Sequence, residues 1–356
     1  MIRSVTDGWK QYWLGTGILP DRTNRLEDVY LRFYNGSTTK EYRNMLTFLL
    51  SEVTRLYEIK GFERDYKVIL IHVHAADTGI TAYPLTAYDY KFVPFFLTQV
   101  MVLAYLEAKP DTNVVVLDWS NMALGSYLFN AAGKNVKKVG AAAAKQLNRL
   151  LETGIKLEDL HVIGHSLGSH VAGYIARELK NKYNKTVKRL TLLDPAVIGL
   201  LPDVVLEHVG ADDAEFVEVI HTDAGSYGTT ARTGTADFFP NGGKGPQPGC
   251  PPSPRFALYP ITIRKMSSHS RSWWFYAESL RNPKAFPASP AKSYREFKQN
   301  PTPDVGMVYM GIACDTSARG SYYLMTNSQT PFGKGMDGIY FSRTKQEKFK
   351  RTDKYL

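Results

Sequence analysis

Residues 157–180, LEDLHVIGHSLGSHVAGYIARELK, constrain the fold of this chain more than any other stretch. A short apolar run leads into GHSLG (164–168), and residues with apolar and small side chains follow at helical spacing. Glycine at 164 and 168 allows a sharp turn, because side chains there would collide. The turn lifts Ser166 to the top of a sheet at a helix N-terminus, where the helix dipole favours developing negative charge. This context predicts a nucleophilic serine; the alternative is a Gly-rich turn with a solvated serine.

A nucleophilic serine needs a base and an acid that orients the base. On such an elbow the acid follows the serine in the chain, and the histidine comes last. The next apolar run, residues 187–200 (VKRLTLLDPAVIGL), reads as a buried parallel strand that ends at Asp194-Pro195. Active sites of open α/β sheets form at this edge, so Asp194 is the candidate acid. The alternative is a solvated strand end.

The chain has eight histidines, and three of them follow Asp194: His208, His221 and His269. His221 lies in AEFVEVIHTD (214–223), inside or just past a buried strand, and is the more typical of a core histidine. His269 lies in KMSSHSRSWWFYAESL (265–280), in a polar loop that is expected to open an aromatic-rich helix. A loop position can bring an imidazole over the serine, so His269 is favoured. His165, inside the motif, is expected to pack beside the turn.

Several long segments resemble the pancreatic lipase family of neutral lipases, which includes insect phospholipase A1 enzymes and insect yolk proteins. These segments are VVVLDWS (114–120), HVIGHSLGSHVAG (161–173), LTLLDPA (190–196), EFVEVIHTDAG (215–225), ADFFPNGGKGPQPGC (236–250), SSHSRSWWFYAESL (267–280) and MGIACDTSARGSYYLMTN (310–327). They are specific, they stand in the family's order, and they cover most of the chain from about 114 to 327. The resemblance implies an α/β-hydrolase fold and a catalytic triad of Ser166, Asp194 and His269.

The oxyanion strand departs from the family pattern. In KVILIHVHAADTG (67–79), Val73 stands where the family has glycine. The oxyanion hole needs two backbone N–H groups, which we assign to Leu167 and to His74 or one of its neighbours. A β-branched residue is unfavourable wherever a positive φ is needed. Since losing one donor costs roughly 10²–10³ in rate, Val73 predicts low activity.

Two loops near the expected site are short for a lipase. The segment 251–268, which should hold the lid, is proline-rich, and the loop 224–240 is rich in Gly and Thr. Among the relatives, short loops accompany phospholipase A1 selectivity, because a polar head group then has room. This favours phospholipid substrates beside triacylglycerol; the alternative is that 251–268 is simply an exposed loop.

The sequence says less about disulfides and cofactors. Only Cys250 and Cys314 are present, and Ser267 stands where the family has a partner for Cys250, so few disulfides are expected. No metal motif is visible, although Asp212 and Asp213 lie near the family's calcium loop. No cofactor is expected apart from this hint of calcium.

The compartment is inferred from the resemblance. The first residues, MIRSVTDGWKQYW, show no signal peptide, and no apolar run approaches the ~20 residues of a membrane span. Family resemblance implies secretion, and the glycosylation sequons at Asn35 and Asn184 are compatible with it.

The composition fits one α/β domain of 356 residues, with 44% hydrophobic and 22% charged residues. Strands are expected at 28–34, 67–73, 114–118, 160–164, 188–193 and 216–221. Helices are expected at 40–60, where apolar residues recur with a period near 3.6, and at 92–109. Together they predict a mainly parallel sheet with helices on both faces and no C-terminal β-sandwich domain.

The net charge of +10 is partly concentrated in the tail 343–356. A basic surface can contact anionic lipid, and the alternative is a solvated basic face without a partner. Nucleic-acid binding is disfavoured because no binding-module signature accompanies the charge. The sequence therefore predicts a lipid ester hydrolase with a lipid substrate. The alternative is a weak or inactive lipase-fold protein that binds lipid or serves as a yolk-type store, which the Val73 substitution favours.

Overall fold

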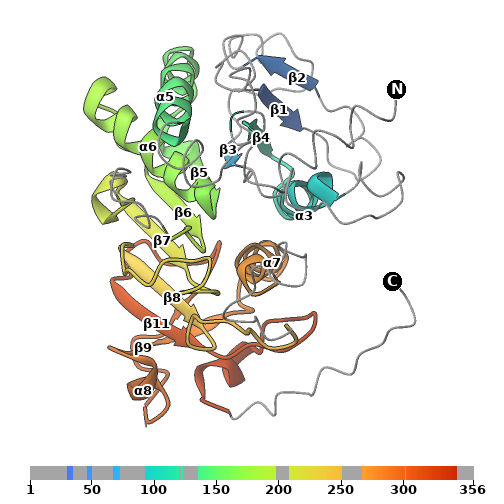
Figure 1. The fold of residues 1–356 in the computed structure, drawn as a ribbon, viewed down its shortest axis with the longest axis vertical. Coiled ribbons are helices and arrows are strands. Elements are labelled where there is room, and N and C mark those ends of the chain that lie inside the picture. The colour runs from blue at the N-terminus through green and yellow to red at the C-terminus, as the bar shows by residue number, and fades with distance from the viewer. Residues whose placement is uncertain are drawn as a thin grey trace, which may run out of the picture.

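The computed structural model describes residues 30–34, 46–49, 67–72, 93–119, 122, 135–197, 208–250, 267–300 and 302–342 (Figure 1). The strands are β1 (Tyr30–Tyr34), β2 (Leu46–Leu49), β3 (Lys67–His72), β4 (Thr112–Asp118), β5 (Leu160–His165), β6 (Arg189–Leu193), β7 (Phe216–Ile220), β8 (Ala236–Pro240), β9 (Pro287–Pro290), β10 (Val308–Tyr309) and β11 (Gly320–Leu324). The helices are α3 (Val93–Ala108), α5 (Val136–Glu152), α6 (Leu167–Tyr183), α7 (Ser267–Arg281) and α8 (Tyr294–Phe297), with 3₁₀ turns η5 (Leu157–Asp159), η6 (Ala211–Asp213) and η7 (Gly335–Ile339).

The strands join one sheet in the order β10-β9-β11-β8-β7-β6-β5-β3-β4-β1-β2. All neighbours between β4 and β11 pair in parallel, whereas β1, β2, β9 and β10 pair antiparallel at the two edges. Within the parallel block, β5 follows β3 in space and β6 follows β5, so the ends of β5, β6 and β7 lie side by side at one edge. This sheet confirms the predicted α/β-hydrolase fold.

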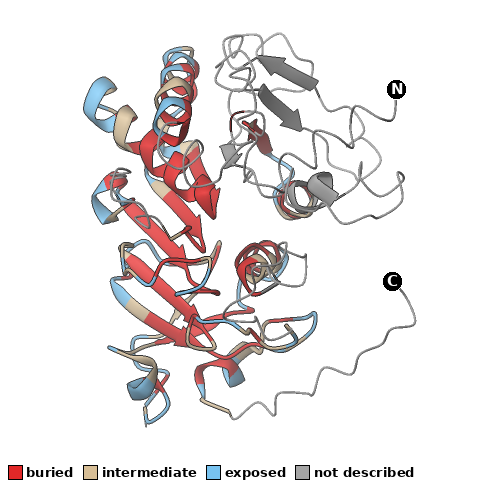
Figure 2. Cartoon of the chain, viewed as in Figure 1, coloured by how far each residue is buried: buried red, intermediate tan, exposed pale blue. Residues whose placement is uncertain are grey.

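Helices cover both faces of the sheet, because the parallel strands are apolar on both sides. In β4, Val115 and Leu117 pack in the core under α5 and α6, while Val114 and Val116 pack in the core under α3 and α7. This alternation follows from the two-residue period of a strand. Figure 2 shows the consequence: β5 and β7 are buried along their whole length, and α5 and α6 keep an exposed outer side.

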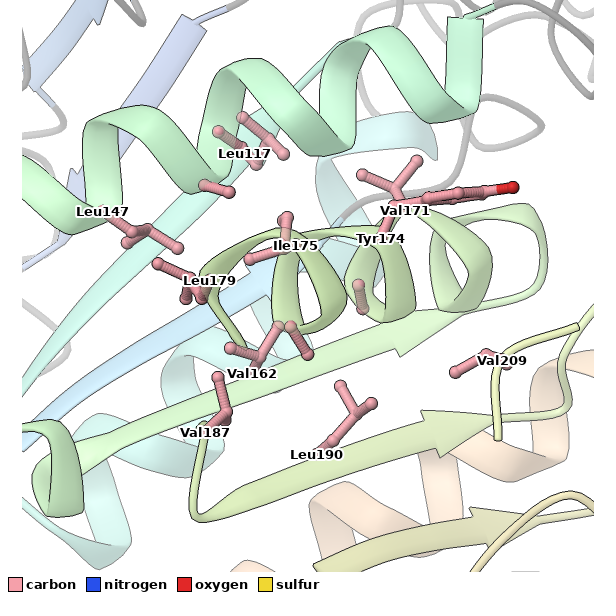
Figure 3. Packing of buried hydrophobic residues seen from close by; sticks show 14 of the residues in the cluster. Leu117, Leu147, Val162, Val171, Tyr174, Ile175, Leu179, Val187, Leu190 and Val209 are labelled. Carbon is pink, nitrogen blue, oxygen red and sulfur yellow. The ribbon is translucent and has the colours of Figure 1, made fainter. Parts of the chain in front are cut away.

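The helix pair over the elbow is tightly packed. In Figure 3, Leu147 of α5 and Ile175 and Leu179 of α6 meet above Val162 of β5, and all four belong to one buried cluster. Each such side chain contributes about 1.5–3 kcal/mol on burial, so this layer fixes α6 on the sheet. A Cβ added at Gly140 of α5 would lie 2.5 Å from Cβ of Tyr174, so this close approach requires glycine.

The strands expected near 30, 67, 114, 160, 188 and 216, and the helix expected at 92–109, are confirmed within a few residues. The helix expected at 40–60 is wrong where the structure describes it, because residues 46–49 form β2, antiparallel to β1. The apolar pattern of residues 46–49 fits a helix as well as a strand, because four residues are too few to distinguish the two periods. The pairing with β1 decides for the strand. The stretch 224–240 is also not all loop, since its end forms β8 between β7 and β11. In the part of the chain that the structure describes, no helix is long and apolar enough to cross a bilayer.

Candidate active site

The turn between β5 and α6 has the predicted elbow geometry. Ser166 has φ 55° and ψ −126°, a backbone conformation that costs a non-glycine residue roughly 1–3 kcal/mol. The Ser166 N–H donates to the Leu193 carbonyl at 3.0 Å, and the Ser166 carbonyl accepts from the Ala196 N–H at 3.1 Å. A Cβ added at Gly164 would lie 2.5 Å from the Gly168 carbonyl oxygen, which explains the glycine there. The strained serine is therefore held by β6 and by the close fit of the turn.

Asp194 follows the last residue of β6 and is fully buried. Its Oδ1 accepts the N–H groups of Thr222 at 2.8 Å and of Asp223 at 3.1 Å, both just past β7. Gly228 covers the carboxylate so closely that a Cβ there would lie 2.5 Å from Oδ1. These contacts hold the carboxylate in a fixed orientation.

His269 is the third residue of α7 and not part of a preceding loop, so the expected loop position is wrong. Its Nδ1 lies 2.6 Å from Oδ2 of Asp194, although the two residues are 75 positions apart. Its backbone carbonyl accepts the hydroxyl of Ser272 at 2.9 Å. With the proton on Nδ1 for this bond, a neutral imidazole presents a lone pair on Nε2, which is the tautomer a general base needs. The Nε2 atom is buried and makes no hydrogen bond to any described residue, so a bond to Ser166 is not formed in this conformation.

Two rings lie against the imidazole of His269. The ring of His165 is 4.6 Å away between centroids, and its Nε2 lies 3.4 Å from the His269 carbonyl. His165 thus packs beside the turn, as expected. The ring of Tyr227 is 5.6 Å away, at an angle of 35°. Since His165 precedes Ser166 directly, its contact with His269 brings the base to the elbow.

His221 and His170 have structural partners away from this pair. His221 binds Asp237 through Nε2 at 2.8 Å and stacks on Phe239 at 4.5 Å. His170 donates from Nε2 to the Ala196 carbonyl at 2.9 Å, and burial lowers its pKa to about 4. Both therefore act as core histidines, which is the role expected for His221.

Asp223 is a second buried acid beside the site, and sequence reasoning missed it. It directly follows Thr222 in the segment after β7, so the same strand-end logic that identified Asp194 could have found it. Burial, and then the negative charge of Asp194, raise the pKa of Asp223 to about 7. Its Oδ2 is buried and accepts no hydrogen bond from the described residues. The carboxyl group is thus held near the midpoint of its titration at neutral pH.

Gln247 is a second residue that the sequence did not single out. Its side-chain N–H₂ group donates to the carbonyls of Thr222 and Pro240, each at 3.0 Å, and its backbone N–H donates to Ser268 Oγ, also at 3.0 Å. Thr222 donates to Asp194, and Ser268 precedes His269. Gln247 therefore ties the loop that holds the acid to the helix that carries the histidine.

Only part of the expected oxyanion hole and of the lid falls within the described residues. Leu167 is the first residue of α6 and is buried, and the N–H groups in a first helical turn have no partner within the helix. The strand β3 ends at His72, which is in register with Gly164 of β5. Val73 and His74 lie outside the described residues, as do most of the lid segment 251–268 and the tail 343–356.

The structure describes both cysteines and the part of the expected calcium loop around Asp213. Cys250 and Cys314 are both free, and burial raises the pKa of the Cys314 thiol far above its usual range. Asp213 is occupied by Arg177, whose Nε and Nη2 donate to its two oxygens at 2.8 and 3.0 Å. A guanidinium already neutralises this carboxylate, and the described residues hold no group of three or more His, Cys, Asp or Glu that could bind a metal ion. The described residues here do not fit a calcium ion.

Known proteins resemble this chain over much of its length. The family model described as Lipase matches residues 74–332. Inactive pancreatic lipase-related protein 1 of Homo sapiens is 32% identical over 355 residues, covering 92% of this chain and 70% of that protein. Vitellogenin-2 of Ceratitis capitata is 32% identical over 234 residues, covering 64% of this chain and 51% of that protein. Pancreatic triacylglycerol lipase of Sus scrofa is 36% identical over 222 residues, covering 58% of this chain and 48% of that protein.

Among solved structures, the α/β hydrolase enzyme MGS-M1 from a deep-sea metagenome library aligns with a TM-score of 0.32 and 15% identity, over 58% of this chain and 69% of that chain. The chain spans about half the length of the vitellogenin and of the pancreatic triacylglycerol lipase. The family model, in contrast, extends over most of the chain, from residue 74 through the elbow, the acid and the histidine to residue 332. On this match, the chain belongs to the lipase family.

Proposed function

We propose that the protein hydrolyses carboxylic esters of lipids through a triad of Ser166, His269 and Asp194. The observation that carries the proposal is the 2.6 Å bond between His269 Nδ1 and Asp194 Oδ2, made at the sheet edge where Ser166 sits on its strained elbow. A buried acid, a base with a vacant Nε2 and a serine at a helix N-terminus are the parts that acyl transfer needs.

The reaction follows from these positions. Ser166 Oγ attacks the ester carbonyl while its proton moves to His269 Nε2, which requires a movement that brings these two atoms within hydrogen-bond distance. Asp194 stabilises the imidazolium that forms, and Nε2 then donates the proton to the leaving alcohol. Water enters next and is activated by the same Nε2 to release the fatty acid from Ser166.

The oxyanion of each tetrahedral intermediate is assigned to the backbone N–H groups of Leu167 and His74. The dipole of α6 adds to the first of them, since its N-terminus begins at the serine. The end of β3 beside Gly164 supports this assignment, because His74 follows that end by two residues. Val73 at the glycine position makes us expect a modest rate.

The proposed substrates are phospholipids as well as triacylglycerols, and the proposed setting is extracellular. The short lid segment 251–268 favours a polar head group at the rim, where Arg255 and Arg264 could bind a phosphate. The net charge of +10 supports contact with anionic lipid surfaces. We further propose that the chain is a single hydrolase domain with a basic tail, and that it is secreted like the family it resembles.

The second candidate is a lipid-binding or storage protein with little or no activity. Val73 favours it, and so do the printed names of two relatives, an inactive lipase-related protein and a vitellogenin. The buried Asp194–His269 pair argues for the enzyme, since a store has no need for a buried acid bonded to a histidine.

An active-site probe separates the two. A fluorophosphonate should label the wild-type protein and the exposed control Ser317→Ala but not Ser166→Ala, and the labelled proteins should hydrolyse phosphatidylcholine and a short-chain triglyceride. If the wild-type protein is neither labelled nor active on any of these esters while it is folded and binds lipid, the storage function replaces the enzyme.

A further inference from the structure

The turn that follows Asp223 carries an aromatic residue into the site. The Gly225 N–H donates to the Gly228 carbonyl at 2.8 Å, and the N–H groups of Ser226 and Gly228 both donate to the Asp223 carbonyl at 3.1 Å. The Tyr227 carbonyl accepts the Val197 N–H at 2.8 Å. The backbone of Tyr227 is thus tied to the segment after Asp194, so its side chain leaves the turn in a fixed direction.

That side chain lies against the histidine of the proposed triad. The centroids of the Tyr227 and His269 rings are 5.6 Å apart, within the ~6 Å over which an aromatic ring attracts a cation. Tyr227 is half-buried, whereas His269 is fully buried. Burial, and then the charge of Asp223, raise the pKa of Tyr227. The phenol is therefore neutral over the working range, and its ring acts on a cation through its quadrupole and its shape.

We propose that Tyr227 is a positioning residue for His269: its ring holds the imidazole plane toward Ser166 and stabilises the imidazolium that forms during acyl transfer. This inference rests on the proposed function. The imidazole also faces Asp194 from the end of β6, Asp223 from the turn after β7 and His165 from the end of β5. Those groups are unchanged by substitution of Tyr227, so a comparison of variants isolates the ring.

The test compares Tyr227→Phe, which keeps the ring, with Tyr227→Leu and Tyr227→Met, which remove it. Tyr340→Leu, at an exposed tyrosine that directly follows η7, is the matched control. Hydrolysis of a soluble short-chain ester is measured from pH 5 to 9. The phenylalanine variant should stay within about 2-fold of wild type, while the ringless variants should lose roughly 3- to 20-fold in kcat at similar KM.

The pH profile of the rate would not change if Tyr227 had only a structural role. Because the ring favours the protonated imidazole, its removal should shift the acidic limb of the rate profile to lower pH by roughly 0.5–1 unit. Unchanged kcat and profile in both ringless variants, with unchanged melting temperature, would overturn the proposal. An equal loss in Tyr227→Phe would also overturn it, since the hydroxyl and not the ring would then matter.

A second readout does not depend on activity. The ring current of Tyr227 should displace the NMR signal of the His269 Cε1–H, and this displacement should persist in Tyr227→Phe and vanish in Tyr227→Met. If the wild-type protein is inactive and unlabelled while the displacement follows this pattern, the proposed function fails but the ring contact stands. Labelled, active protein whose signal is insensitive to all three substitutions refutes the inference alone.

Discussion

The carboxyl group of Asp223 should make the stability of this protein depend on pH, and the substitution Asp223→Asn tests this dependence. The pKa of its carboxyl group is raised from 3.8 to about 7 by burial and by the charge of Asp194. Between these two values the folded protein binds a proton that the unfolded chain has already lost, so its stability falls as the pH rises toward 7. In Asp223→Asn the side chain is neutral at every pH, and this dependence should disappear.

The magnitude follows from the interval chosen for the measurement. Between pH 5 and pH 8, about two pH units lie below the pKa of Asp223 in the folded protein. Each of these units lowers the unfolding free energy by about 1.4 kcal/mol. The wild-type protein should therefore lose about 3 kcal/mol of unfolding free energy over this interval relative to Asp223→Asn. Any cost of placing an amide at this site is the same at each pH and cancels in the comparison.

Urea unfolding followed by tryptophan fluorescence at pH 5, 6, 7 and 8 measures this difference. Asp212→Asn, which removes an exposed carboxylate from η6, is the control and should run parallel to wild type. If wild type and Asp223→Asn change in parallel from pH 5 to pH 8, the carboxyl group is ionised throughout and the reasoning is wrong.

Three further predictions concern the site and its substrate. Val73→Gly should raise kcat for ester hydrolysis by up to ~10²-fold with little change in KM if valine distorts one oxyanion donor; an unchanged rate in a folded variant would show that the backbone already points correctly. Gln247→Leu should lower the unfolding free energy by roughly 2–4 kcal/mol and also lower kcat, because it leaves buried carbonyls without donors and loosens the link from Thr222 to Ser268. Thermal melts check this, with the exposed Gln299→Leu as the control. Equal melting temperatures for the two variants would contradict it. With the short segment 251–268, hydrolysis of dispersed phospholipid should begin below the aggregation threshold and should equal or exceed that of long-chain triglyceride; a sharp rise only at a triglyceride interface would refute this.

The sequence by itself predicted the elements whose signal is local. The elbow at Ser166 can be predicted from adjacent residues. The apolar period indicates the strand and the helix, and the two glycines meet the short-range steric demands of the turn between them. The central strands and α3 follow for the same reason, as does the position of Asp194 at a strand end. His269 was favoured from its context, although His208 and His221 satisfied the same chain order.

Tertiary structure alone decided what depends on partners distant in the chain. Residues 46–49 form a strand because β1 offers them a pairing edge, and β8 forms because β7 and β11 flank it. His269 meets Asp194 across 75 positions through the packing of α7 on the sheet. The same packing places Asp223 beside Asp194 and Tyr227 beside His269. None of these contacts leaves a pattern in neighbouring residues, because each depends on how separate elements pack together and not on the local preference of either one.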